Sequence, residues 1–247
     1  MDANAAEILG ELNNRFYRKV ASSFSQTRDY PWKGWDAVYG KLAVAGIGKQ
    51  KLDVLDVACG NLRFEKFAHE KCPDVEIVFT AVDSCEDLVG ERPNVAFECR
   101  DIVAELRRES SGNLFGSERY DAVVCFGFMH HVYGAESRRA LVEHMHAAVK
   151  PGGIMAVSFW EFAQDDVALS KAEAVTRQGL TQLGLDRLEE GDYLLGWNNM
   201  PNVFRYCHSF TSKEIDGLLA GLQATCVERY LADGKNGRAN EYVIVCR

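Results

Sequence analysis

Hydrophobic and polar positions follow two alternating patterns between residues 52 and 160. Short, nearly continuous apolar runs, typical of strands buried on both faces, alternate with stretches that have helical spacing. The apolar runs predict strands at 52–57, 76–82, 95–99, 120–126 and 154–160, with helices at 62–72 and 135–149. Because strands and helices alternate along the chain, we expect an α/β fold with a doubly wound, mostly parallel sheet.

The pattern changes after residue 160. A helix is predicted at 165–183, followed by an irregular stretch to about residue 205, a helix at 212–222 and strands at 224–231 and 241–246. Asp233-Gly234 and Asn236-Gly237 are turn signals, so the last two strands are expected to form an antiparallel hairpin.

These patterns divide one overall domain into four parts. Residues 1–51 form an amino-terminal helical segment, 52–160 the core of the sheet, and 211–247 its carboxy-terminal part. Residues 161–210 form an insertion, which we expect to lie as a lid over the carboxyl edge of the sheet, where open α/β sheets bind ligands.

Charge is distributed unevenly along the chain. The 247 residues carry a formal net charge of -8, which argues against a protein that coats long stretches of nucleic acid. Residues 13–51, however, hold eight basic side chains against Asp29 and Asp36, a local net charge of +6, with aromatic residues interleaved. The segment is therefore either a solvated helix face or a surface for one anionic substrate.

The cysteines and the apolar runs bear on the surroundings of the protein. The eight cysteines lack the spacings of zinc sites and several lie in apolar runs, so we expect buried, reduced thiols and no metal. The amino terminus has no secretion signal, and no apolar run is long enough for a membrane span. We therefore expect a cytoplasmic protein that does not associate with membranes.

Acidic residues end successive predicted strands. Asp56 ends the first strand before the turn at Gly60, Asp83 ends the second, and Asp101 follows the third. In a doubly wound sheet these positions meet in one crevice, where the second carboxylate can accept both ribose hydroxyls of a nucleoside and the third can accept an adenine amino group. Gly60 allows the backbone to approach the ligand closely. The sequence therefore predicts a nucleoside ligand.

The turn after the first strand distinguishes between nucleoside cofactors. Ala58 and Arg63 replace the first and third glycines of the dinucleotide fingerprint, which disfavours a nicotinamide cofactor. The stretch instead resembles the motif of class I S-adenosylmethionine-dependent methyltransferases, and the resemblance continues through Asp83-Ser84, Arg100-Asp101-Ile102, His130-His131 and residues 120–124 and 150–153. It implies a Rossmann-like fold, S-adenosylmethionine as cofactor and methyl transfer.

Strand ends and resemblance together give the expected cofactor-binding residues. They are Asp56, Ala58, Gly60, Asn61, Asp83, Ser84, Asp101, Ile102, Cys125 and Phe126. The family usually has glycine in place of Leu62, whose branched side chain would lie beside the methionine tail. A non-catalytic protein that retains the fold is therefore one alternative.

A narrower resemblance lies in the flanking segments. Residues 16–28, followed by Pro31-Trp32, resemble the amino-terminal signature of the tRNA wobble-uridine carboxymethyl methyltransferases, and Arg205-Tyr206-Cys207-His208 resembles their R-Y-Y-H element. The resemblance implies a carboxylate on a modified tRNA uridine as methyl acceptor. It also raises the hypothesis of a small activating partner protein, and the oligomeric state stays open. A small-molecule O- or N-methyltransferase is the alternative that fits the acidic body.

The type of acceptor determines which side chains the chemistry needs. A carboxylate needs no general base but does need a cation, for which Arg28 and Arg205 are the candidates. A hydroxyl or amine acceptor would need a base, for which His131 and His208 are candidates, with His130 beside them. We expect substrate contacts from Trp32, Trp197 and Tyr206. Structural roles compete with the functional ones for these histidines and for Tyr206.

Overall fold

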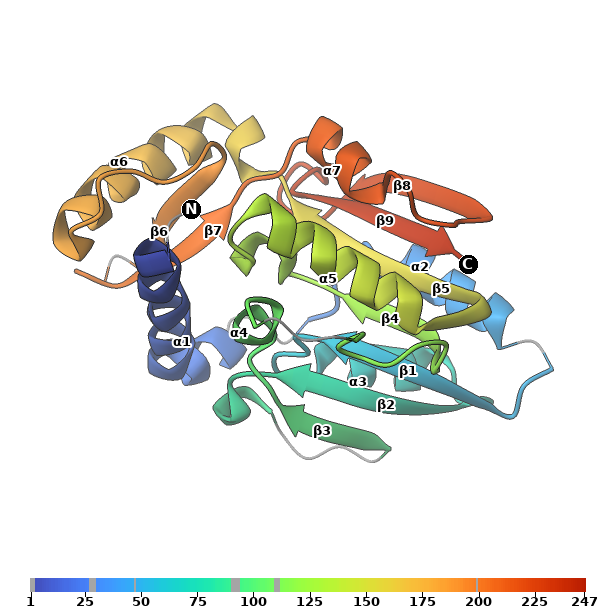
Figure 1. Cartoon of the computed structure of the whole chain (residues 1–247). Coiled ribbons are helices and arrows are strands. Elements are labelled where there is room, and N and C mark those ends of the chain that lie inside the picture. Colours follow the sequence, from blue (N-terminus) through green and yellow to red (C-terminus); the bar gives the residue numbers. More distant parts are fainter. Residues whose placement is uncertain (1–2, 27–29, 47, 90–93, 109–111, 199) are drawn as a thin grey trace.

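The computed structural model describes residues 3–26, 30–46, 48–89, 94–108, 112–198 and 200–247, which are built around one large sheet (Figure 1). Its strands are β1 (Lys51–Val57), β2 (Glu76–Asp83), β3 (Val95–Cys99), β4 (Tyr120–Cys125), β5 (Val149–Trp160), β8 (Cys226–Ala232) and β9 (Asn240–Cys246). They lie in the order β3-β2-β1-β4-β5-β9-β8. Strands β1 to β5 pair in parallel, and β9 is antiparallel to β5 and β8. The predicted α/β sheet with its terminal hairpin is confirmed.

Helices cover both faces of the sheet and its carboxyl edge (Figure 1). They are α1 (Ala3–Gln26), α2 (Trp35–Ala45), α3 (Arg63–Lys71), α4 (Ile102–Leu106), α5 (Ala135–Ala148), α6 (Asp166–Leu183) and α7 (Ser212–Leu219). Leu141 and Met145 of α5 pack on Met155 on one face, while Trp35 of α2 and Phe64 of α3 pack on the other. All six residues of β4 are buried, as expected for a central strand covered on both faces. No helix within the described ranges is both long and apolar enough to cross a bilayer.

The insertion contains a hairpin that the sequence analysis missed. Strands β6 (Asp192–Gly196) and β7 (Phe204–His208) pair antiparallel in a separate two-stranded sheet, where an irregular stretch was expected. The hairpin packs against α6 on one side and α1 on the other. Figure 1 shows α1 lying beside the hairpin and across the carboxyl ends of the parallel strands.

A buried polar cluster fastens this hairpin to the core. The His208 Nδ1 lies 2.7 Å from Asp192 Oδ1, and its Nε2 lies 2.8 Å from Glu214 Oε2 at the start of α7. Arg138 of α5 pairs with the other Glu214 oxygen at 3.1 Å, and the Tyr206 hydroxyl donates to Asp192 at 2.6 Å. Burial lowers the pKa of His208, but the two carboxylates outweigh it and raise the pKa above its ordinary value. The imidazolium therefore links β6 to α7.

The turn after β1 keeps a left-handed backbone at three positions. Ala58, Gly60 and Leu62 have φ of 63°, 55° and 58°. The Leu62 side chain is only 1% exposed and packs with Cys59 and Ala81 in the core, so it points away from the space in front of the turn. The substitution for glycine therefore keeps the turn geometry, and buried contacts offset its backbone strain.

Two cysteines are joined, contrary to the expectation of reduced thiols throughout. Cys226 and Cys246 form a disulfide between directly opposed positions of β8 and β9. The spacing of these two cysteines did not indicate a pair, because it is the hairpin register that brings them together. Cys59, Cys72, Cys85, Cys125 and Cys207 are buried free thiols, and Cys99 is an exposed one.

The turn geometry predicts opposite effects for two glycine substitutions. Ala58→Gly should raise the free energy of unfolding by up to about 1 kcal/mol, because it relieves left-handed strain without removing buried contacts. Leu62→Gly relieves the same strain but removes a buried side chain, and should destabilise by about 2 kcal/mol. Urea unfolding measures both. Equal stabilisation by both substitutions would contradict the burial of Leu62.

The cluster around His208 predicts a pH-dependent contribution to stability. Because the folded pKa is raised, the stabilisation is complete below the unfolded histidine pKa, roughly 6.5, and is lost as pH rises through the folded value. His208→Ala should cost about 3 kcal/mol at pH 6 and less at pH 9. Urea titrations at both values test this. His144→Ala is the control, because burial lowers the pKa of His144 and its removal should show no such decline. A pH-independent cost of His208→Ala would contradict a charged His208.

Candidate active site

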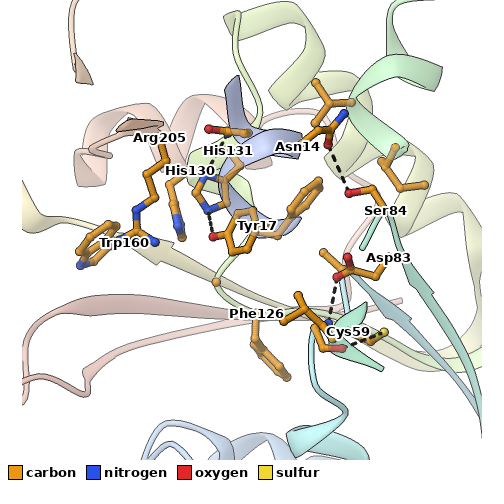
Figure 2. Close-up of a pocket in the computed structure, with 18 of the residues that line it drawn as sticks. Asn14, Tyr17, Cys59, Asp83, Ser84, Phe126, His130, His131, Trp160 and Arg205 are labelled. Carbon is orange, nitrogen blue, oxygen red and sulfur yellow. Dashed lines mark hydrogen bonds between the residues drawn. The ribbon is translucent and has the colours of Figure 1, made fainter. Parts of the chain in front are cut away.

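A cavity of about 740 Å³ opens at the carboxyl edge of the sheet, beneath α1 (Figure 2). Its volume lies in the range of small-molecule sites, roughly 300–1,000 Å³. It lies where the order of the strands reverses between β1 and β4, the usual ligand position in open α/β sheets. We call the wall near Gly60, Asp83 and Asp101 the cofactor arm, and the wall near His131, Trp160 and Arg205 the acceptor arm.

Asp83 anchors the cofactor arm at the end of β2. Its Oδ2 accepts a hydrogen bond from Gly60 N at 2.9 Å, and its Oδ1 accepts one from Cys85 N at 2.8 Å. Burial raises the pKa of Asp83, while these backbone N–H groups lower it. A side chain added at Gly60 would meet no atom within 4 Å, so the turn leaves space for a ligand. Asp83 and Gly60 therefore fit a nucleoside whose ribose hydroxyls donate to the remaining carboxylate lone pairs.

Helix α1 closes over the cofactor arm through Asn14. Asp101 caps α4 by accepting from Ala104 N, and its other oxygen accepts from Asn14 Nδ2, both at 2.9 Å. The Ser84 hydroxyl donates to Asn14 Oδ1 at 3.5 Å. Sequence reasoning missed Asn14, because only the packing of α1 brings it to the strand ends. An adenine amino group that donates to Asp101 would share its carboxylate with Ala104 N and Asn14 Nδ2.

Two of the expected cofactor residues do not reach the cavity. Asp56 is buried against Glu65 of α3, and burial together with that carboxyl raises the pKa of Asp56 well above its ordinary value. The pair lies beneath the turn as a support, and Cys125 is fully buried in β4. The structure corrects both expectations. The other expected cofactor residues line the wall: Ala58, Gly60, Asn61, Asp83, Ser84, Asp101, Ile102 and Phe126.

Arg205 is the central feature of the acceptor arm. It is 7% exposed, and its guanidinium carbon lies 5.3 Å from the ring centroid of Phe16 and 5.7 Å from those of Trp160 and Trp197. Within the described ranges, no carboxylate forms an ion pair with it, and its Nε has no hydrogen-bond partner. Burial lowers the pKa of Arg205, but Cys207 and Tyr17 raise it by more, so that the pKa lies above its ordinary value and the group stays charged. A buried cation in this state is suited to bind an anion.

Tyr17 and His131 stand beside this guanidinium (Figure 2). The His131 Nδ1 lies 2.9 Å from the Tyr206 carbonyl, and its Nε2 lies 2.6 Å from the Tyr17 hydroxyl. Because a carbonyl only accepts, Nδ1 carries a proton, and Nε2 is hydrogen-bonded to the Tyr17 hydroxyl. Asn13 holds the same segment through the Tyr206 main chain, accepting from its N–H at 2.7 Å. This geometry fixes the His131 ring between the Tyr206 carbonyl and the Tyr17 hydroxyl.

Other expected site residues have different positions. Tyr206 and His208 are buried on the face of β7 that is turned away from the cavity, in the cluster with Asp192, and do not line the cavity. The structure therefore corrects the expectation that they contact substrate or act as a base. Trp32 and Trp197 line the cavity. Arg28 lies outside the described residues.

Sequence reasoning also passed over Tyr17, which lines the cavity in the acceptor arm. Tyr17 was read only as one aromatic of the basic segment, although the Phe-Tyr pair in the resemblance was the available signal. In that segment, Lys41 and Lys49 pair with Glu228 and Asp121 of the body. Arg15 and Arg18 are exposed on α1.

Comparisons with known proteins bear on the same residues. Residues 55–155 match a family model described as a methyltransferase domain. Two curated relatives are tRNA (carboxymethyluridine(34)-5-O)-methyltransferases: that of Macaca fascicularis is 25% identical over 167 residues, and that of Arabidopsis thaliana is 26% identical over 164 residues. Each alignment covers 66% of this chain but only 22% and 36% of the respective relative. The chain thus matches a minor part of these longer proteins.

Solved structures share the fold at low identity. A methyltransferase from Methanosarcina mazei has a TM-score of 0.57 at 16% identity, covering 81% of this chain and 93% of that one. The 1,6-didemethyltoxoflavin-N1-methyltransferase of Burkholderia thailandensis, solved with S-adenosylhomocysteine, has a TM-score of 0.55 at 18% identity, covering 100% and 91%. The match to the methyltransferase domain model falls on the strands and turns that build the cofactor arm.

Proposed function

We propose that this chain methylates a carboxylate, forming a methyl ester, and that the carboxylate belongs to a modified uridine of tRNA. The observation that carries the proposal is the buried, charged guanidinium of Arg205, which has no carboxylate partner in the described ranges and lines the same cavity as the cofactor arm. A planar guanidinium can bind both oxygens of a carboxylate in parallel hydrogen bonds. The names of the two curated relatives support the tRNA acceptor.

The side chains of the acceptor arm suit a nucleophile that is already ionised. When bound, S-adenosylmethionine supplies an electrophilic methyl group, which a carboxylate oxygen takes up while the electron pair of the broken bond stays on sulfur. Arg205 would hold the carboxylate, and Phe16, Trp160 and Trp197 would exclude water from it. No proton moves in this transfer, so it needs no general base.

The alternatives differ in what they require of the site. A non-catalytic protein was suggested by Leu62, but that side chain is buried away from the cavity and the turn keeps its left-handed geometry. A small-molecule methyltransferase fits the net charge of -8 and differs from our proposal in its acceptor. Assaying methyl transfer to a small acid and to the RNA separates the small-molecule alternative from our proposal.

Asp83 gives a test of the cofactor arm. Asp83→Ala should weaken S-adenosylhomocysteine binding at least 10-fold in isothermal calorimetry, because the ribose loses its carboxylate acceptor. Asp36→Ala, on the exposed face of α2, is the control and should bind as the wild type does. If the wild type does not bind at millimolar ligand, the chain is not a methyltransferase of this kind.

Arg205 gives a test of the acceptor. Arg205→Met should lower methyl transfer to an anticodon stem–loop RNA bearing 5-carboxymethyluridine about 100-fold, because a bidentate, desolvated ion pair is lost. Arg205→Lys should recover part of the rate, and both variants should retain S-adenosylhomocysteine affinity within 3-fold. Transfer of labelled methyl groups measures the rate.

Two outcomes of the Arg205 assay would contradict the proposal. The first is a wild-type rate in Arg205→Met, which would remove the guanidinium from the acceptor site. The second is methylation of a small acid but not of the RNA by the wild-type protein, which would favour the small-molecule alternative. The amide analogue of the uridine should not accept a methyl group from any variant.

A further inference from the structure

A second concavity adjoins the acceptor arm. It has a volume of about 1320 Å³ and lies between the end of β5, the start of α6 and the turn joining β8 to β9. We call it the rim groove. Trp160, Gly234 and Ala239 line both this groove and the active-site cavity. The rim groove therefore leads outward from the place where Arg205 would hold the acceptor.

The cations and the carboxylates of the rim groove are disposed differently. Lys171, Lys235 and Arg238 are exposed, and in the part of the chain that the structure describes none of them forms an ion pair. Glu241 is buried and accepts from Arg229 and Ser212. Asp165 is exposed and caps α6 by accepting from Ala168 N at 2.8 Å.

The remaining carboxylate of the groove is shielded from solvent. Glu161 is buried, and burial together with the neighbouring Glu241 raises its pKa, which favours its neutral form. The groove thus presents three exposed cations and one exposed carboxylate, that of Asp165, on a protein whose total charge is -8.

Aromatic rings accompany these cations. Trp160, at the boundary between cavity and groove, lies 4.5 Å from Phe162 between ring centroids. Tyr230 also lines the groove, stacked on Tyr242. A basic groove with aromatic rings is the surface that single-stranded nucleic acids bind, since cations meet the phosphates and rings stack with bases.

We propose that the rim groove binds the nucleotides that flank the methyl-accepting residue in a single-stranded RNA segment. The phosphates pair with Lys171, Lys235 and Arg238, and the flanking base lies against Trp160. This assignment rests on the proposed function for the identity of the acceptor. It goes further by locating where the rest of a polymeric substrate lies.

Binding of a fluorescent anticodon stem–loop RNA, measured by anisotropy with S-adenosylhomocysteine present, tests the groove. K171E/K235E/R238E should weaken binding at least 30-fold at low salt and reduce the slope of log K against log salt by about 2, as expected for three lost phosphate contacts to a single strand. The control K66E/R139E/R187E has the same charge change at exposed positions outside both cavities and should bind within 2-fold of the wild type.

Failure of the groove and failure of the proposed function give different results. If the groove variant keeps the affinity and salt slope of the wild type while Arg205→Met still lowers methyl transfer, RNA binding by the rim groove is overturned and the proposed function stands. Salt-dependent binding that the groove variant loses, with no methyl transfer to the carboxylate by the wild type, would support the groove and overturn the acceptor. If the groove variant and the control lose binding equally, net charge alone accounts for the loss, and RNA binding by the rim groove is overturned.

Discussion

A charged guanidinium is costly to bury without a counter-charge, and helix α1, the β6–β7 hairpin and the end of β5 meet around such a group. Strand β7 carries Arg205, α1 contributes Phe16 and Tyr17, and the end of β5 contributes Trp160. None of these contacts is local in sequence. The hairpin must hold its position for the guanidinium to face the cavity, and the ion pairs of His208 behind β7 fasten it there.

The sheet and the cofactor arm followed from local patterns in the sequence. Apolar runs of strand length gave the positions of the parallel strands, and the position of Asp83 at a strand end was enough to place it beside Gly60. The acceptor arm was less accessible, because its contacts join residues far apart in the chain. Asn13 and Tyr206 are 193 residues apart and Tyr17 and His131 are 114 apart, and no periodicity reports such pairs.

The errors at Tyr206 and His208 have one physical cause. Successive side chains of a strand point to opposite faces, so Arg205 cannot face the same way as the residue after it. No strand was expected at residues 204–208, which left all the polar residues of the motif as candidates for the cavity. Once they form β7, Arg205 lies on one face, while Tyr206 and His208 lie together on the other, against Asp192. A motif specifies residue types, but the alternation of side chains along a strand determines which of them lie on the same face and can share a site.

The hydrogen bonds of His131 also bear on which acceptors the site suits. Both ring nitrogens of His131 are engaged, since Nε2 is hydrogen-bonded to the Tyr17 hydroxyl and Nδ1 donates to a main-chain carbonyl. If His131 Nε2 took a proton from a hydroxyl or amine acceptor, the hydrogen bond that holds Tyr17 beside Arg205 would therefore be disrupted. A carboxylate avoids this cost because it arrives deprotonated, and its negative charge is what the buried guanidinium lacks. The same two residues thus favour an acid and disfavour a neutral acceptor.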